Sequence, residues 1–368
     1  MSGGPEPLYW LALLRLRGMD PKRFHQLLAL ASPEELLKGH PDLLAQVFRK
    51  PPGPEEIQEA LRQAEQDLRR AEQRGTHILL HGHAGYPPQL APLEAAPPVL
   101  FVEGDPAVLA ELAIGIVGSR RATAYGKRMA FKLAHDLAAA GAVIVSGGAY
   151  GVDTAAHKGA LEAGGRTVAV LGSGLDQPYP AANRRLFDRI RSQGAVVSEF
   201  PFGTKPFRPN FPIRNRIISG LSRAVVVVEA AERSGALITA QWALDQGREV
   251  MAVPGPADSA LSAGPHRLIR QGAALVTDAA EVLEELGVAP ETAARARPEL
   301  PTLSEEERRV FQALGARPVS LDALAEELGV APMHLMTHLL ALEMKGLIEK
   351  HPGNAYARNP VYTQEESA

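Results

Sequence analysis

The chain has 368 residues, of which 45% are hydrophobic and 22% charged, and its formal net charge is −3. This composition is typical of folded proteins and excludes a disordered or fibrous chain, while the length indicates two or three domains. The charge balance excludes a globally basic nucleic-acid binder but allows a local basic cluster. Because there is no cysteine, disulfides, thiol catalysis and cysteine-based metal centres are excluded.

The sequence predicts neither a signal peptide nor a membrane span. The N-terminus lacks the charged, apolar, small-residue order of a signal peptide, and no apolar run approaches the about 20 residues that a membrane span needs. We therefore expect a cytoplasmic protein. His81 and His83 lie close in sequence but no third ligand stands out, so we expect no metal site.

Residues 1–75 are expected to form a helical domain of the SAM or helix-hairpin-helix kind. The stretch LALLRLRGMDPKRFHQLL has an apolar helical period that Gly18 and Pro21 interrupt, which predicts two short helices. A charged helix is expected to follow the break at PPGPEE and to run to Arg74. A small helical bundle is favoured over a helix-hairpin-helix that offers backbone N–H groups to phosphate, and both remain open. Residues 77–98 appear loop-rich in sequence.

The middle of the chain, residues 76–286, alternates short apolar runs with helical patterns. The predicted strands are VLFVEG, IGIVGS, VIVSGG, VAVLGS, VVSEF, VVVVEA, EVMAVPG and ALVTD. Continuous apolar strands joined by crossover helices are typical of a parallel sheet covered on both faces. We therefore predict an α/β fold with an extended, doubly wound, Rossmann-like sheet.

The C-terminal part is predicted to be a winged helix. Residues 287–301 are rich in Ala, Pro and Arg without an apolar period and are expected to form a linker. Within 302–368, Ser304 and Ser320 are candidate helix caps and Pro332 opens a third helix. Two short strands are expected around Pro-Gly-Asn. The third helix and the residues that follow it, PMHLMTHLLALEMKG, carry one basic residue, so strong duplex binding is not expected.

Glycine-rich turns follow several predicted strands. Gly118 and Ser119 end one strand and precede two arginines, and Ser234 and Gly235 stand at another strand-to-helix turn. Exposed N–H groups, a hydroxyl and a guanidinium suit a phosphate oxygen, although an ordinary tight turn with solvated arginines fits the first motif equally well. There is no G-x-G-x-x-G fingerprint at Gly118 and no Walker lysine, so we expect no nucleotide cofactor and no other cofactor.

A serine hydrolase is a weaker interpretation. Ser146, Asp153 and His157 could be assembled into a triad, but no G-x-S-x-G elbow surrounds the serine. We expect Asp153 to cap the following helix and His157 to support the loop. No catalytic residue is therefore predicted.

The most informative segment lies between Glu199 and Glu229, where no carboxylate occurs. The segment alternates cations with phenylalanines, in a protein that is only 5% aromatic: Phe202, Lys205, Phe207, Arg208, Phe211, Arg214, Arg216 and Arg223. Cations that follow a backbone and rings that stack on bases are what single-stranded nucleic acid requires. The alternative is that the rings anchor a loop to the core and the arginines cap strand ends; for Arg208 and Phe211 together we favour nucleic-acid binding.

Six motifs in order make the chain resemble the DprA/Smf (DNA processing protein A) family of bacterial natural transformation. They are VGSR, SGGAYGVDTAAHKGAL, GLDQPYPAANRRLF, EFPFGTKPFRPNFPIRNRIISGLS, SGALITAQWAL and GPHRLIRQGA. The resemblance covers about residues 87–277, and the flanking helical and winged-helix domains fit it too. It implies a recombination mediator without catalysis, which binds and protects single-stranded DNA, forms a homodimer and helps load the RecA recombinase.

The resemblance also implies roles for single residues. Gly118, Ser119 and Arg120 match the family's phosphate-binding turn, and Arg208 stands where a lysine is frequent. Phe211 matches a ring that stacks on a base. The helix around Leu268 and Ile269 matches the region of dimer contacts. The full set that we predict to bind nucleic acid is Gly118, Ser119, Arg120, Lys205, Arg208, Asn210, Phe211, Arg214, Asn215, Arg216, Ser234 and Gly235.

Two alternatives come from other classes of protein. Phosphoribohydrolases that release bases from nucleotides share this kind of sheet, but Gln241 stands where their catalytic glutamate is expected, and an amide cannot act as a general base. A winged-helix regulator of duplex DNA is the other alternative. It predicts that removing residues 302–368 abolishes DNA binding.

Overall fold

The computed structural model describes residues 6–288, 303–315 and 318–359, which form two compact units. The first unit comprises residues 1–293 and the second residues 294–368. The predicted linker, 287–301, lies almost wholly outside the described residues. The finer division of the first unit at residue 75 stays a prediction.

Four short helices and one long helix open the first unit, and their ends follow the local sequence. Asp20 caps the second helix by accepting a hydrogen bond from the Arg23 N–H, and Ser32 and Glu35 form a capping box on the third. The predicted break at Gly18 and the charged helix ending at Arg74 are confirmed. The elements are α1 (Glu6–Arg15), α2 (Pro21–Leu28), α3 (Pro33–Lys38), η1 (Pro41–Gln46) and α4 (Pro54–Arg74).

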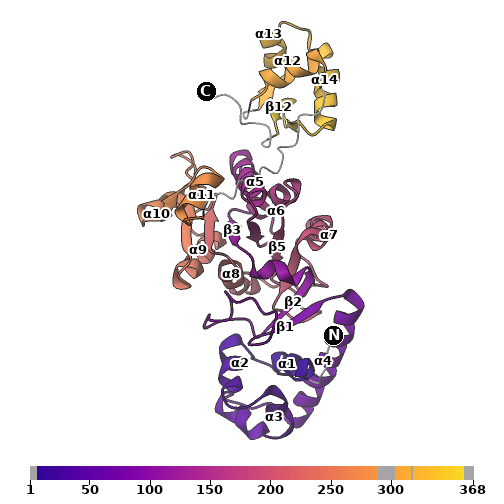
Figure 1. The fold of residues 1–368 in the computed structure, drawn as a ribbon, viewed down its shortest axis with the longest axis vertical. Helices are drawn as coiled ribbons and strands as arrows, with labels where there is room; N and C mark the ends of the chain where they lie inside the picture. Colours follow the sequence, from indigo (N-terminus) through magenta and orange to yellow (C-terminus); the bar gives the residue numbers. More distant parts are fainter. Residues whose placement is uncertain (1–5, 289–302, 316–317, 360–368) are drawn as a thin grey trace. The chain divides into compact units, whose positions relative to one another are not determined.

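A nine-stranded sheet forms the centre of this unit (Figure 1). Its order is β1-β2-β6-β5-β4-β3-β7-β8-β9, and all pairs from β6 to β9 are parallel. All eight predicted strands are present, which confirms the doubly wound α/β fold. The strands are β1 (His77–Leu80), β2 (Val99–Gly104), β3 (Ala113–Val117), β4 (Val143–Ser146), β5 (Thr167–Val170), β6 (Ala195–Ser198), β7 (Ala224–Val227), β8 (Glu249–Ala252) and β9 (Ala274–Leu275).

One edge of the sheet departs from the prediction. β1 lies in the segment that the sequence suggested was loop-rich, and it pairs antiparallel with β2, which itself pairs antiparallel with β6. A four-residue strand with only one fully buried side chain, Leu80, leaves little apolar signal in the sequence. The sheet is therefore mixed at this edge and parallel elsewhere.

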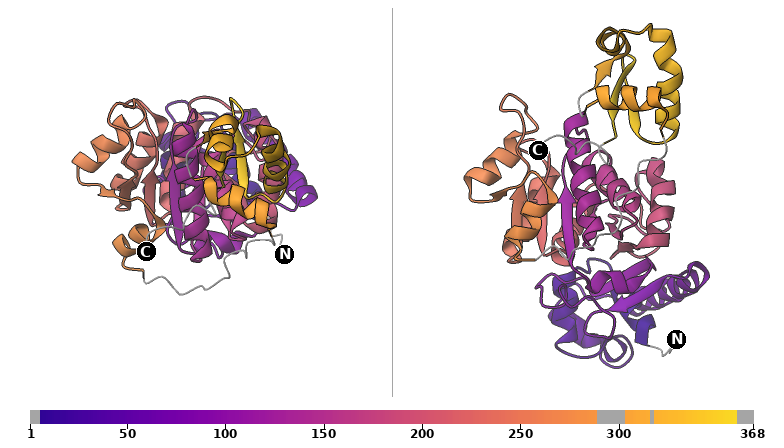
Figure 2. Two further views of the ribbon diagram at one scale, coloured as in Figure 1. Left: turned by 90° about the horizontal axis from the view of Figure 1, so that it is seen from above. Right: turned by 45° about the horizontal axis from the view of Figure 1, so that its top comes forward.

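Helices cover both faces of the sheet (Figure 2). One face packs Ile114, Ile144 and Val226 against α5, α6 and α11, and the other packs Val145, Val170 and Val225 against α8, α9 and α10. This two-sided burial explains the continuous apolar strands of the sequence. The remaining elements of the unit are η2 (Pro106–Ala110), α5 (Ala124–Ala139), α6 (Val152–Glu162), η3 (Ala181–Asn183), α7 (Arg184–Gln193), α8 (Asn210–Leu221), α9 (Gly235–Asp245), α10 (Ala263–Arg270) and α11 (Ala279–Glu285).

The second unit is the predicted winged helix. Ser304 forms a capping box with Glu307, Ser320 caps the next helix, and Pro332 occupies the first turn of the third, as expected from the sequence. Its sheet has the order β10-β12-β11. The elements are α12 (Glu305–Ala313), β10 (Val319–Ser320), α13 (Leu321–Leu328), α14 (Pro332–Met344), β11 (Ile348–His351) and β12 (Ala355–Arg358).

Candidate functional site

A pocket of about 500 Å³ opens at β3, where the order in which strands are added to the sheet reverses. β3 pairs with β4 on one side and with β7 on the other, so the turns after these strands face a shared crevice at the carboxyl edge. Open α/β sheets bind ligands at such a switch point. The lining residues are Val117, Gly118, Ser119, Arg120, Ala149, Asp153, Arg208, Phe211, Pro212, Arg214, Asn215, Ile218, Ala231, Ser234, Gly235, Ala236 and Thr239.

Phe211, in the first turn of α8, is held from several sides. Its ring packs on the backbone of Gly172, where a Cβ atom would lie 2.9 Å from a ring carbon, so only glycine allows this approach. The ring centroid of Tyr179 lies 5.8 Å away. The guanidinium carbon of Arg120 lies 4.9 Å from the centre of the Phe211 ring, which is a cation–π geometry. The ring is thus fixed beside a cation and remains half-buried.

Arg214 forms the floor of the pocket. It is only 3% exposed, and its Nη1 donates to the Gly147 carbonyl at 2.8 Å. A Cβ atom at Gly147 would stand 2.6 Å from Nη2, so the glycine makes room for the guanidinium. Burial lowers the pKa of Arg214 to about 10, which leaves it charged at neutral pH, and the nearby Asp153 opposes this shift. A buried cation here favours an anion in the pocket.

Asp153 is the single carboxylate among the described residues that line the pocket. Burial raises its pKa, and the neighbouring Arg214 opposes that shift. The prediction that Asp153 caps α6 is wrong, because Gly151 holds that position and Asp153 lies inside the first turn. Its carboxylate instead accepts the Ala149 N–H at 3.2 Å and so fixes the turn after β4.

The two cations at the mouth of the pocket, Arg120 and Arg208, are exposed. Among the described residues, neither forms an ion pair with a carboxylate. The predicted N–H donors are partly used within the protein, because the Ser119 N–H donates to Glu229 and the Ser234 N–H to Ala231. Side-chain cations, rather than those two N–H groups, therefore supply the positive charge.

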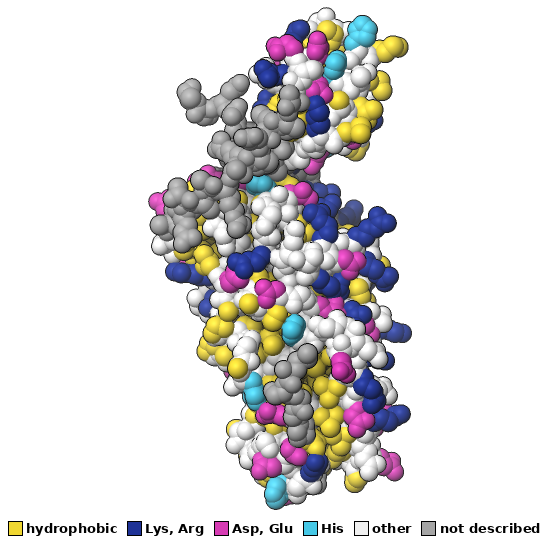
Figure 3. Space-filling view, turned by 45° about the vertical axis from the view of Figure 1, so that its right-hand side comes forward, with side chains coloured by type: hydrophobic (Ala, Val, Ile, Leu, Met, Phe, Trp, Pro, Cys, Tyr) yellow, Lys and Arg dark blue, Asp and Glu magenta, His cyan; other side chains and the backbone are white. Residues whose placement is uncertain are grey.

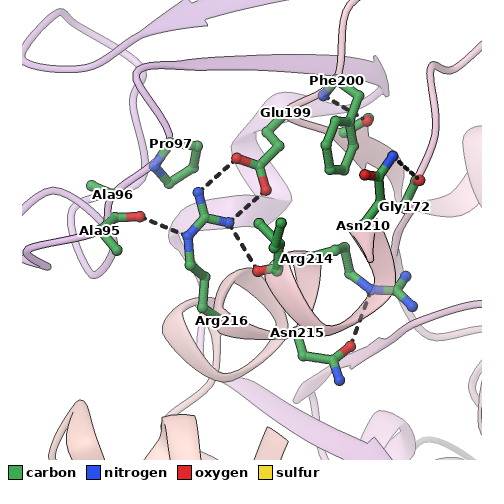
Figure 4. Close-up of polar contacts among 12 residues, drawn as sticks. Ala95, Ala96, Pro97, Gly172, Glu199, Phe200, Asn210, Arg214, Asn215 and Arg216 are labelled. Carbon is green, nitrogen blue, oxygen red and sulfur yellow. Dashed lines mark hydrogen bonds and ion pairs between the residues drawn. The ribbon is translucent and has the colours of Figure 1, made fainter. Parts of the chain in front are cut away.

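Nine of the twelve predicted nucleic-acid residues line this pocket, and three do not. Arg216 lies elsewhere: its guanidinium bonds both carboxylate oxygens of Glu199 at 2.5 and 2.6 Å and the Ala95 carbonyl at 2.8 Å. Figure 4 shows Arg214 and Arg216 leaving α8 on opposite sides. Asn210 donates to the Gly172 carbonyl, and Lys205 is exposed on the preceding loop. The geometry gives Arg216 and Asn210 structural contacts because successive residues of a helix point in different directions.

The predicted dimer helix, α10, is only partly exposed. Leu268 is 6% exposed and packs into the core, and Ile269 packs on the same core while remaining half-buried. Dimer contact through this helix stays a prediction. Leu268 needs no partner chain to be buried.

The side chains of the rejected triad have other partners. The Ser146 hydroxyl donates to the Ile116 carbonyl, and His157 bonds Thr167 of β5 rather than the loop that we expected it to support. Gln241 lies on α9, outside the pocket lining, and its amide donates to Asp245. Among the described residues, no group of three or more acidic or histidine side chains is placed to hold a metal ion. No described helix has both the length and the apolarity to cross a membrane.

Sequence reasoning missed two aromatic residues near the pocket. Tyr179 contacts Phe211, and Tyr150 follows Ala149, which lines the pocket. Tyr150 lies in the motif SGGAYGVDTAAHKGAL and Tyr179 in GLDQPYPAANRRLF, but neither tyrosine was predicted to contribute to the site. A tyrosine in a turn at the carboxyl edge of a sheet is a signal that could have found them.

A switch-point pocket with a fixed ring and uncompensated arginines is typical of an anion-binding protein built on a Rossmann-like sheet. The sequence model described as DNA recombination-mediator protein A matches residues 77–287, and that of the DprA winged helix domain matches 291–354. The chain therefore belongs to the DNA recombination-mediator protein A family, as its motifs had suggested.

Individual relatives agree with this assignment. The chain is 43% identical over 290 residues to "Protein Smf" of Escherichia coli, with 77% of each protein covered. It is 34% identical to "Protein Smf" of a Synechocystis strain, with 96% of this chain and 99% of that protein covered.

Two solved structures are similar. DNA processing protein A from Streptococcus pneumoniae matches with a TM-score of 0.67 and 37% identity, and covers 76% of this chain and 97% of that one. The second structure is DNA processing protein A from Helicobacter pylori, described for its single-stranded DNA binding mode. It matches with a TM-score of 0.52 and 30% identity, and the match covers 57% of this chain and 95% of that one.

Proposed function

We propose that this protein binds single-stranded DNA in the switch-point pocket and acts as a mediator of homologous recombination during natural transformation. The observation that carries the proposal is Arg120 standing over Phe211 at the mouth of a pocket whose floor is the buried Arg214. A base can stack on the ring while phosphates meet the arginines. Two comparisons support it: the chain belongs to the DNA recombination-mediator protein A family, and the similar structure from Helicobacter pylori concerns the single-stranded DNA binding mode of DNA processing protein A.

The finer parts of the proposal follow from the family. We propose that the protein protects the bound strand, works in the cytoplasm as a homodimer and helps load the RecA recombinase, without catalysis of its own. The pocket supports binding rather than chemistry, because Asp153 is buried and engaged by the Ala149 N–H. The alternative is a phosphoribohydrolase, and for that enzyme Asp153 would be the candidate catalytic group, because it is the one carboxylate among the described residues that line the pocket.

A direct comparison of ligands tests the proposal. Fluorescence anisotropy of the purified full chain should show tighter binding to a single strand of about 16 nucleotides than to a duplex of the same length. In parallel, incubation with nucleoside monophosphates should release no base. Base release that is lost in Asp153→Asn would favour the hydrolase, and equal affinity for duplex and single strand would contradict the proposed ligand.

The winged helix gives little support to duplex recognition. No Lys or Arg occurs within α14, and its exposed side chains include Met333, Met336, Leu340 and Met344. Lys345, which follows the helix, is paired with Glu307 at 2.7 Å. Duplex readers place cations on this helix, so the first unit remains the better candidate for DNA binding.

A further inference from the structure

Two arginines outside the pocket are exposed without an acidic partner. Arg184 and Arg185 occupy the first turn of α7, and neither forms an ion pair with a described carboxylate. That turn holds no acidic residue, and the positive end of the helix dipole disfavours cations there. Two cations in this position destabilise the free protein, and a bound anion would offset their unfavourable interaction with the helix dipole.

The described carboxylates of the surrounding elements have other partners, and none of them forms an ion pair with these two arginines. From β4 to the end of α7 the acidic residues are Asp153, Glu162, Asp176 and Asp188. Glu162 pairs with Arg189 at 3.1 Å, Asp188 pairs with Arg191 at 2.8 Å, and Asp176 accepts the Gly203 N–H. Figure 3 shows Lys and Arg side chains gathered on one side of the first unit.

Hydrogen bonds connect this turn directly to the pocket wall. Asn183, the residue before Arg184, donates its side-chain amide to the Gly148 carbonyl at 2.9 Å and to the Thr154 hydroxyl at 2.8 Å. Gly148 precedes Ala149, which lines the pocket. The start of α7 therefore lies beside the turn that forms this wall of the pocket.

The turn after β4 also carries an exposed aromatic ring, that of Tyr150. Tyr150 is 46% exposed and follows Ala149, while the Val152 N–H donates to the Ser119 carbonyl at 3.2 Å and ties this turn to the arginine-bearing one. An exposed tyrosine on the turn next to the pocket adds a ring to the two cations at the start of α7, and this combination repeats the ring-and-cation pattern of the pocket itself.

We propose that Tyr150, Arg184 and Arg185 form an outer track that takes the nucleotides flanking the one in the pocket. This inference rests on the proposed function and adds the direction in which the strand leaves the pocket, from β3 across the ends of β4 and β5 toward α7. The two arginines meet successive phosphates, and Tyr150 stacks on a base between them and the pocket. The occupant is a single strand, because its bases are free to stack.

Two oligonucleotide lengths separate this inference from the proposed function. A strand of about 4 nucleotides is to be compared with one of about 16, the limits of common site sizes. For Arg184→Gln/Arg185→Gln, we expect unchanged affinity for the short strand. For the long strand, we expect affinity about tenfold lower at low salt and a logarithmic salt slope reduced by about 1.4, which corresponds to two phosphates.

Matched variants serve as controls. Arg189→Gln lies on the same helix but removes a cation that is already paired with Glu162, and it should leave both affinities unchanged. Tyr150→Ala should weaken only the long strand and Tyr150→Phe should restore it, since a phenyl ring also stacks. Thermal unfolding confirms that each variant is folded.

The outcomes are distinct. If wild type binds both strands and the double variant behaves like Arg189→Gln, the outer track is wrong while the pocket stands. If the double variant weakens both lengths equally, the arginines belong to the pocket and the track is likewise wrong. If wild type binds neither strand, the proposed function fails and the track with it.

Discussion

Arg120 and Phe211 come from segments 91 positions apart in the sequence, yet the guanidinium carbon lies 4.9 Å from the ring centre. The arginine follows β3 and the phenylalanine opens α8, so the pair spans the switch point of the sheet. The pair therefore places a cation and an aromatic ring next to each other in the pocket. Separate removal of each member should therefore have different consequences.

Loss of a cation should reduce both affinity and its salt dependence. We expect Arg120→Ala and Arg208→Ala each to weaken single-strand binding and to lower the logarithmic salt slope by about 0.7, the value for one phosphate on a single strand. Binding isotherms at several salt concentrations measure this. An unchanged slope in both variants would show that neither arginine meets a phosphate.

Loss of the ring should reduce affinity alone. Phe211→Ala should weaken single-strand binding by about 1–3 kcal/mol while leaving the salt slope nearly unchanged, because stacking releases no counterions. Phe207→Ala is the matched control, since Phe207 is 63% exposed and does not line the pocket. Equal effects of the two substitutions on affinity would contradict the assignment of Phe211.

Arg216 should matter for folding. Arg216 and Glu199 are 4% and 9% exposed and form a buried ion pair, and breaking such a pair costs about 3–5 kcal/mol. Arg216→Met should lower the free energy of unfolding by about that amount in urea titrations, whereas Arg208→Met, at an exposed site, should change it by less than about 0.5 kcal/mol. The double variant Arg216→Met/Glu199→Leu should recover part of the loss. Similar stability of the two single variants would argue against this structural role.

Acid should destabilise the first unit through His157. Its Nδ1 bonds the Thr167 hydroxyl, which itself donates to Ile144, so the histidine donates, and its Nε2 is buried without a partner. Burial lowers the pKa of His157 to about 3. Because this value is below the ordinary 6.5, stability is full above pH 6.5 and falls as the pH drops toward 3, by up to about 1.4 kcal/mol per unit.

His157→Asn tests that linkage. The asparagine amide can still donate to Thr167 but has no titration in this range, so the variant should lose less stability than wild type between pH 6.5 and 4. Urea unfolding at pH 7, 5.5 and 4.5 gives the comparison. Parallel stability curves for the two proteins would show that His157 does not contribute to the acid limb.

The winged helix should be dispensable for most single-strand affinity. A chain ending at residue 293, the boundary of the first compact unit, should bind a single strand within a fewfold of the full chain. The pocket and its arginines all lie in that unit. Complete loss of binding in a folded truncated chain would instead favour the winged helix as the DNA-binding part.

The sequence by itself determined most of the sheet and the segments that line the pocket. Two-sided burial produces strands that are apolar throughout, so β2 to β8 could be predicted, and the carboxylate-free segment pointed to Arg208 and Phe211, which both line the pocket. β1 could not be found, because a short edge strand with one fully buried residue has no clear pattern. Tertiary structure decided which cations the pocket gathers. Arg214 and Arg216 are two positions apart on α8, and only the direction in which each leaves the helix sends one to the pocket and the other to Glu199.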